Sequence, residues 1–176
     1  MAGKPSVFAG DTFESKYGVF SVIEYTNAKD VEVLFHTTGF VCRIEAADIR
    51  KGNVKDPLSP SVQGVGVIGV GPHKVSRNRK ALKEYNIWAQ MLRRCYSEGY
   101  HKKKPTYKGC KVDDRWLNYQ LFCEDLPLLE GYDLFSQNLP CHLDKDIRVP
   151  GNKVYSRDTC KFVTPSENSK EPFKRK

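Results

Sequence analysis

The chain has 176 residues, of which 39% are hydrophobic and 28% charged, and its formal net charge is +8 at pH 7. This length suits one medium domain or two small ones, and the composition is that of a chain that folds. No apolar run is long enough to span a bilayer, and the first residues lack the features of a signal peptide. We therefore expect a soluble cytoplasmic protein with no membrane partner.

The first segment is rich in β-branched and aromatic residues whose polarity alternates. Three runs, at 17–26, 30–38 and 40–50, are separated by the turn sequences NAKD and TG, which predicts three strands. Three or more short strands in about 45 residues are typical of a small antiparallel SH3-like β-barrel, which we place at residues 1–58. Such barrels bind nucleic acids, peptides or nothing at all, and all three alternatives stay open.

Residues 59–78 have the composition of a Pro/Gly-rich basic linker. Within them, Gly64 to Gly69 match the G-x-G-x-x-G spacing of a dinucleotide-binding turn. That turn needs a strand before it, a helix after it and an acidic residue roughly 20 positions later. Here a Pro/Ser-rich stretch precedes the glycines, a basic stretch beginning at Pro72 follows them, and the acidic residue is missing. We expect a flexible or closely packed connector.

Two amphipathic helices are predicted after this connector, and both are interpreted as scaffold. In residues 79–96 the side chains at helical spacing are Ala81, Tyr85, Trp88, Leu92 and Cys95. Residues 113–125 begin with Asp113 or Asp114 as the N-cap. The inward-facing side chains of this second helix would be Trp116, Tyr119 and Phe122 or Cys123.

The positive charge is confined to the middle of the chain. Residues 1–60 carry a net charge of −1, residues 61–110 carry +9 and residues 111–176 carry 0. Such clustering favours a surface that follows the phosphates of a nucleic acid, although a solvated face is the ordinary alternative. The candidate nucleic-acid-binding residues are Lys74, Arg77, Arg79, Lys80, Arg93, Arg94, Lys102, Lys103, Lys104 and Lys108.

The C-terminal segment predicts a hairpin followed by a helix. CHLDKDI and DTCKFV are strand-like and VPGNK is a turn. Thr164, Pro165 and Glu167 then form a capping box with proline at the first helical position. In this arrangement, residues at the end of the first strand converge with the second turn of the helix. Asp144, Asp146 or His142 would approach Asn168, and converging carboxylate and amide oxygens suit a hard divalent cation such as Mg²⁺.

The combination of motifs over residues 85–168 resembles a family of phage-encoded HNH-type proteins related to homing endonucleases. The first motif is the W-x-x-M-x-x-R-C-Y helix, and YKGCKV with WLNY gives the second. The third is LDKDI, followed by YSRDTCKFV and the asparagine of TPSEN. The resemblance implies an α+β fold in which residues 79–176 form an HNH-like domain with a ββα-metal hairpin and helix. Family members often carry a further DNA-binding module, a role that the N-terminal barrel would fill.

The resemblance also implies roles for individual residues. Asp144 would be a metal ligand and Asn168 the helix ligand, holding Mg²⁺ or Mn²⁺. The sequence departs from the family in two places: Lys145 stands where the histidine general base is expected, and Asp158 or Thr159 stands near the place of the middle asparagine. A protonated lysine cannot activate water, so His142 becomes the candidate base and Asp146 a candidate additional ligand.

Six cysteines are present without a C-x-x-C pair. Buried, reduced thiols are the default, and a zinc site made by Cys110, Cys123, Cys141 and Cys160 is the alternative. Pro172 is expected to end the last helix.

The sequence therefore predicts a metal-dependent endonuclease acting on double-stranded DNA. One alternative is a catalytically inactive module that binds nucleic acid or a host protein. Another is a protein that docks a host protein through its N-terminal barrel.

Overall fold

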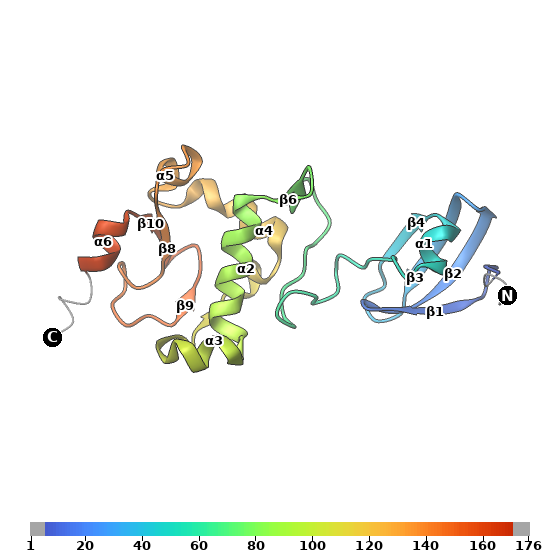
Figure 1. The fold of residues 1–176 in the computed structure, drawn as a ribbon, viewed down its shortest axis with the longest axis horizontal. Helices are drawn as coiled ribbons and strands as arrows, with labels where there is room; N and C mark the ends of the chain where they lie inside the picture. Colours follow the sequence, from blue (N-terminus) through green and yellow to red (C-terminus); the bar gives the residue numbers. More distant parts are fainter. Residues whose placement is uncertain (1–5, 171–176) are drawn as a thin grey trace. The chain divides into compact units, whose positions relative to one another are not determined.

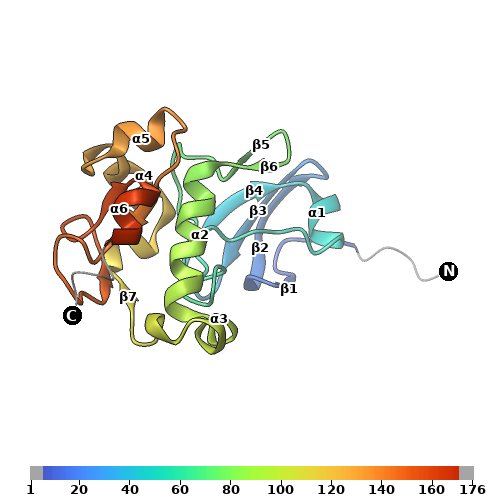
Figure 2. The same cartoon turned by 60° about the vertical axis from the view of Figure 1, so that its left-hand side comes forward.

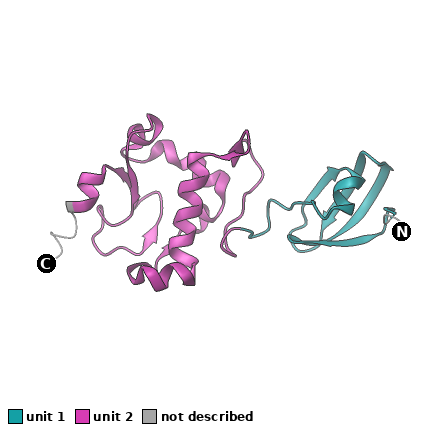
Figure 3. Ribbon diagram, viewed as in Figure 1, with its two compact units in different colours: residues 1–61 teal, residues 62–176 magenta. Residues whose placement is uncertain are grey.

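The computed structural model describes residues 6–170, and the chain divides into two compact units, residues 1–61 and 62–176 (Figure 3). The fold is mixed α+β, as the sequence predicts. Each unit has its own hydrophobic core, one made by residues up to Val54 and the other by residues from Val62 onward. Pro172 lies outside the described residues.

The first unit is a four-stranded antiparallel sheet in the order β1-β2-β3-β4 (Figure 1). Its strands are β1 (Thr12–Ser15), β2 (Gly18–Asn27), β3 (Asp30–Phe35) and β4 (Val41–Ile44). Alternate residues of β2 and β3 face the core, where Phe20, Val22, Val31, Val33 and Phe35 are all buried. Among the described residues, β1 and β4 do not pair with each other, so no closed barrel is formed.

The strand predicted at 40–50 ends at Ile44, and the short helix α1 (Ala46–Arg50) follows it. Ala46 and Ile49 are one helical turn apart and both are buried. The Ala46 amide donates a hydrogen bond to the carbonyl of Ala28, which anchors the start of this helix to the turn between β2 and β3. Local alternation of polarity therefore predicts this stretch poorly, because α1 depends on contacts with a distant turn.

The second unit is built around the helix α2 (Lys83–Tyr96), which buries Trp88, Met91, Leu92 and Cys95. The hairpin of β5 (Ser76–Arg77) and β6 (Lys80–Ala81) lies at the N-terminal end of α2, and α3 (Glu98–Lys103) lies at its C-terminal end (Figure 2). The predicted helix at 79–96 therefore begins four residues late, because residues 80 and 81 belong to β6.

The helix predicted at 113–125 is divided in two at Asn118. Asp113 caps the 3₁₀ helix η2 (Asp114–Leu117), and Asn118 caps α4 (Tyr119–Asp125), each through its own side chain. The elements around them are η1 (Pro105–Tyr107), β7 (Lys111–Val112), η3 (Leu126–Leu128) and α5 (Tyr132–Ser136). Trp116, Tyr119 and Phe122 are buried, as predicted, although they lie on two short helices.

The GVGVIGVG stretch, residues 64–71, packs against the rest of the second unit. The Val67 amide donates to the Leu117 carbonyl at 2.9 Å, and the Tyr119 amide donates to the Val67 carbonyl at 3.0 Å. Gly66 is placed so that an added Cβ would meet Leu92 and lie 2.9 Å from Trp88. From Val62 onward, the segment assigned to a linker at 59–78 is therefore part of the second unit.

The C-terminal segment forms the strand, strand, helix order that its sequence predicts. β8 (His142–Asp144) pairs antiparallel with β10 (Lys161–Val163), and α6 (Pro165–Lys170) follows. The capping box is confirmed, because the Thr164 amide donates to Glu167 and the Glu167 amide donates to the Thr164 hydroxyl. The connection is longer than a turn: it includes β9 (Val154–Tyr155), which pairs in parallel with β7.

All six cysteines are free thiols, and Cys95, Cys110, Cys123 and Cys160 are buried. Burial raises the pKa of Cys95 to about 12 and that of Cys123 to about 11. These thiols are therefore protonated at neutral pH. In the part of the chain that the structure describes, no helix is long and apolar enough to cross a membrane.

Candidate functional site

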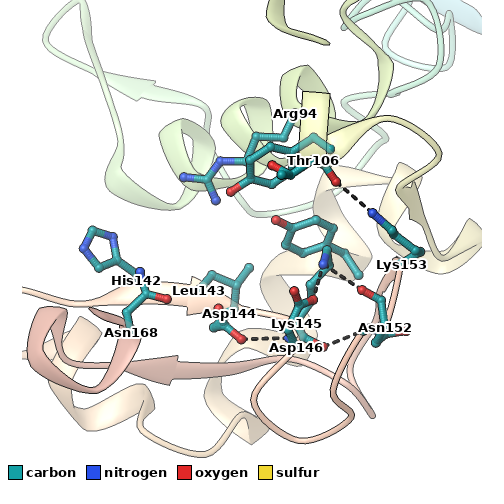
Figure 4. A pocket seen from close by; sticks show the side chains of 13 residues that line it. Arg94, Thr106, His142, Leu143, Asp144, Lys145, Asp146, Asn152, Lys153 and Asn168 are labelled. Atoms are coloured by element: carbon teal, nitrogen blue, oxygen red, sulfur yellow. Dashed lines mark hydrogen bonds and ion pairs between the residues drawn. The ribbon is translucent and has the colours of Figure 1, made fainter. Parts of the chain in front are cut away.

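A cleft of about 440 Å³ lies in the second unit (Figure 4). Arg94 of α2, with Thr106 and Tyr107 of η1, forms one wall. The other wall is formed by β8, the loop that follows it and α6. A smaller hollow of about 220 Å³, lined partly by Ile87, Met91 and Arg94, shares His142 and Leu143 with the cleft. The cleft thus collects residues from segments about fifty positions apart in the chain.

The pleat of β8 determines which of its side chains reach the cleft. Leu143 is buried in the core, whereas His142 is exposed and Asp144 is half-buried. His142 and Asp144 are two residues apart and therefore lie on the same face of the strand. Asn168, from the second turn of α6, lies at the same end of the cleft as these two residues. The structure thus brings His142, Asp144 and Asn168 to one place.

The carboxylate of Asp144 is oriented by the backbone that follows it. Its Oδ1 accepts hydrogen bonds from the amides of Asp146 at 2.7 Å and Ile147 at 2.9 Å. These two bonds hold the side chain against the first turn of the loop. Asp144 therefore presents a carboxylate whose position is defined by the fold.

Lys145, the residue after Asp144, points into the protein. Its side chain is only 7% exposed, and its ammonium group forms an ion pair with Asp146. It also donates to the Asn152 carbonyl at 2.7 Å and lies 5.7 Å from the centre of the Tyr155 ring. Both Lys145 and Asp146 are therefore engaged with each other and with the loop that they support.

Asn152 also lines the cleft, although its sequence context predicts only a turn. Its side-chain amide donates to the carbonyls of Lys145 at 2.9 Å and Val154 at 2.6 Å. Its Oδ1 accepts from the Val154 amide at 3.1 Å. Together with the Lys145 contact, these bonds close the loop between β8 and β9. The only signal in the sequence was an asparagine after glycine in PGNK, which is also common in ordinary turns.

Arg94 supplies positive charge to the opposite wall. Its guanidinium lies 5.7 Å from the centre of the Tyr107 ring. Burial lowers the pKa of Arg94, but the neighbouring hydroxyl groups of Tyr155 and Tyr107 outweigh this effect and raise it. Arg94 is therefore a half-buried cation facing Asp144 and Asn168 across the cleft. A guanidinium in this setting is well suited to a phosphate oxygen.

The cleft offers a carboxylate and an amide oxygen, which are ligands that a hard cation prefers. Among residues 6–170, no three His, Cys, Asp or Glu side chains form a group that could hold a metal ion, so the four cysteines considered above form no such site. Mg²⁺, however, usually keeps several waters and takes one or two carboxylates plus substrate phosphates. Asp144 and the amide oxygen of Asn168 would supply the protein ligands of such an ion.

The remaining candidate nucleic-acid-binding residues fall into two groups. Lys74, Arg77, Arg79 and Lys80 are exposed on or beside the β5–β6 hairpin. Lys102, Lys103, Lys104 and Lys108 are exposed around η1, near the cleft, and Arg93 lies over the Tyr100 ring. The 14 residues of α2 separate the two groups, which corresponds to about 21 Å of helix. The basic segment therefore forms two surfaces.

Comparison with known proteins gives no family assignment: no family model, no curated protein and no solved structure matches this chain.

Proposed function

We propose that this protein binds double-stranded DNA and hydrolyses a phosphodiester bond with Mg²⁺ or Mn²⁺, as a divergent, phage-type HNH-like endonuclease. One observation carries the proposal: Asp144, Asn168, His142 and Arg94 line the same cleft although they come from three different elements. In this proposal, β8, β10 and α6 are the ββα-metal element of an HNH-like domain. The resemblance over residues 85–168 supports the same assignment.

Each of these residues has a role that follows from its chemistry. Arg94 binds a phosphate oxygen and holds the backbone of the nucleic acid in the cleft. Asp144 and Asn168 hold the cation, which when bound would stabilise the negative charge that develops on the phosphate. His142 accepts the proton of the attacking water, because Lys145 is engaged with Asp146 and Asn152. Lys145 and Asp146 are thus positioning residues that support the loop behind Asp144.

The first unit would act as the accessory module. Its four strands follow one another in the order β1-β2-β3-β4, which is compatible with an open SH3-like sheet. Such modules bind nucleic acids or proteins. Residues 1–61 have a net charge of −1, which disfavours a role in following phosphates. We therefore assign DNA binding to the second unit and propose that the first unit binds a host protein.

A second candidate function is that of a catalytically inactive DNA-binding module. The observation in its favour is the buried ion pair of Lys145, which replaces the usual base with a residue that stabilises the loop. In that case the cleft would bind a backbone phosphate without cutting it. The same experiment separates the two candidates.

The decisive experiment is nicking of supercoiled DNA with and without Mg²⁺ or Mn²⁺, comparing the parent protein with Asp144→Asn. Asparagine keeps an Oδ1 that can accept from the amides of Asp146 and Ile147, so the loop is preserved while the carboxylate charge is lost. We expect metal-dependent nicking that falls at least about 100-fold in the variant. Asp133→Asn, in an exposed position on α5, is the matched control and should cut like the parent.

Two results would count against the endonuclease. Equal nicking by the parent and Asp144→Asn would remove the proposed metal ligand. Salt-sensitive DNA binding without any metal-dependent nicking by the parent would leave the inactive binding module as the function.

A further inference from the structure

The β5–β6 hairpin has a turn whose conformation is unfavourable for its sequence. Ser76 pairs with Ala81 and Arg77 with Lys80, which leaves Asn78 and Arg79 as a two-residue turn. Both have positive φ, 50° for Asn78 and 61° for Arg79. This is the pattern of a type I′ turn, in which glycine is the preferred second residue. Asparagine tolerates the left-handed conformation, whereas a long side chain such as that of Arg79 is strained by it.

A second feature of the same hairpin is also unfavourable for folding. Arg77 and Lys80 are direct cross-strand partners, so their side chains lie on the same face of the two-stranded ribbon. Like charges placed opposite each other repel, and this pair lies next to the cation of Arg79. Two independent local costs are therefore concentrated in four residues, and a bound polyanion would relieve the repulsion between the cations.

The base of the hairpin is firmly attached to the second unit. The Tyr119 hydroxyl donates to the Lys74 carbonyl at 3.1 Å, and the Leu82 amide donates to the Val75 carbonyl at 3.0 Å. Just before the hairpin, the Gln120 side chain accepts from the His73 amide at 2.9 Å and donates to its carbonyl at 3.0 Å. Because Tyr119 and Gln120 are buried, the tip is held out from a fixed base.

The tip itself is exposed and cationic. Arg77, Arg79 and Lys80 are all exposed, and the ion pairs found among residues 6–170 involve other cations. Residues 73–81 contain no Asp, Glu, Phe, Tyr or Trp. Surfaces that bind single strands rely on aromatic side chains to stack the bases, and this tip has none. The major groove of B-form DNA, in contrast, admits a two-stranded β-ribbon, while that of A-form RNA is too deep and narrow.

We propose that the β5–β6 hairpin is a groove-binding element for double-stranded DNA, with the Arg79 side chain entering the groove and Arg77 and Lys80 contacting its flanking phosphates. This inference rests on the proposed DNA binding of the second unit and adds the element that recognises the duplex. The hairpin lies beyond the N-terminal end of α2, and about 17 Å of helix separates Lys83 from Arg94 in the cleft. Recognition and hydrolysis thus use different parts of the unit.

The substitution Arg79→Gly should increase the stability of the protein but weaken its binding to DNA. Glycine relieves the positive-φ strain, so the melting temperature of the second unit in the full chain, followed by tryptophan fluorescence, should rise by about 3 °C. Loss of the guanidinium should weaken binding to a short mixed-sequence duplex about tenfold. If a phosphate contact is lost as well, the slope of log affinity against log salt, measured between about 50 and 200 mM, should fall by roughly 1.

Three further variants serve as controls in the binding experiment. Arg79→Gln loses the charge but keeps the strain, so it should bind as weakly as Arg79→Gly without the gain in melting temperature. Arg79→Lys should bind nearly as well as the parent if a phosphate is contacted, and poorly if a base edge is read in bidentate fashion. Lys111→Gln removes an exposed cation on β7, far from the hairpin in sequence, and should leave the affinity unchanged.

The outcomes distinguish this inference from the proposed function. If the parent binds duplex DNA and Arg79→Gly and Arg79→Gln bind equally well, the hairpin proposal is overturned while DNA binding stands. Equal competition by single-stranded DNA or double-stranded RNA would also overturn it. A parent protein that binds no nucleic acid would overturn both the inference and the proposed function.

Discussion

Lys145 is a charged residue that supports the cleft from inside the protein. Its ammonium is held by Asp146, by the Asn152 carbonyl at 2.7 Å and over the face of Tyr155. Lys145 is turned inward, because its side chain is almost fully buried. The loop of the cleft is therefore stabilised from within.

Replacing Lys145 by methionine should destabilise the second unit by about 2 kcal/mol, because Asp146 loses its ion pair with Lys145 while remaining mostly buried. Urea unfolding followed by tryptophan fluorescence measures this effect, since Trp88 and Trp116 are the only tryptophans and both lie in that core. Lys153→Met is the matched control. Lys153 is exposed and makes one bond to the Thr106 carbonyl, so its loss should change the unfolding free energy by less than about 0.5 kcal/mol. Identical unfolding curves for the parent and Lys145→Met would contradict the structural role.

At the scale of elements, the GVGVIGVG stretch is explained by packing. Its backbone lies between α2 and η2, where hydrogen bonds from Val67 to Leu117 and from Tyr119 to Val67 attach it. Gly66 is buried there because Trp88 and Leu92 occupy the space that a side chain would need. Gly66, Gly69 and Gly71 allow the backbone to approach neighbouring side chains closely, a requirement that the dinucleotide-like spacing does not reveal.

The substitution Gly66→Ala should cost about 2 kcal/mol of unfolding free energy, because the new methyl group would overlap Leu92 and Trp88 in a closely packed core. Tryptophan fluorescence again provides the signal, and Trp88 reports directly on the site. Gly99→Ala, within α3, has only Ser97 Oγ near the added Cβ, at 3.9 Å, and should be neutral or slightly stabilising. If both variants unfold at the same urea concentration as the parent, the close packing at Gly66 does not contribute to the free energy of unfolding.

At the scale of the whole molecule, the two units have separate cores and opposite charges. Residues 62–176 contain 22 Lys and Arg against 13 Asp and Glu, whereas residues 1–61 contain 7 against 8. The cleft, the basic hairpin and the lysines around η1 all belong to the second unit. Binding of a polyanion is therefore expected to be a property of that unit alone.

The fragment 62–176 should fold without the first unit and bind duplex DNA within about threefold of the affinity of the full chain. Near-UV circular dichroism tests folding, and fluorescence anisotropy with labelled duplex tests binding. The fragment 1–61 should bind the same duplex at least about 100-fold more weakly. Strong binding by fragment 1–61 would instead assign DNA recognition to the sheet.

Local sequence determined those features whose causes lie within a few residues. The Thr164–Glu167 capping box, the two strands that precede it and the buried face of α2 are examples, because capping bonds and helical or strand periodicity act over short distances. The same local patterns predict that residues 142–146 approach residue 168, and these residues line the cleft.

Tertiary structure alone decided the features that depend on distant contacts. The inward turn of Lys145 depends on Asn152, the division of the helix at Asn118 depends on Val67, and the packing of Gly66 depends on Trp88 and Leu92. The strain at Arg79 follows from its positive φ, which the local sequence does not predict. Each of these features depends on which segments of the chain contact one another. Those contacts are determined by the packing of the whole core, which local sequence patterns do not reveal.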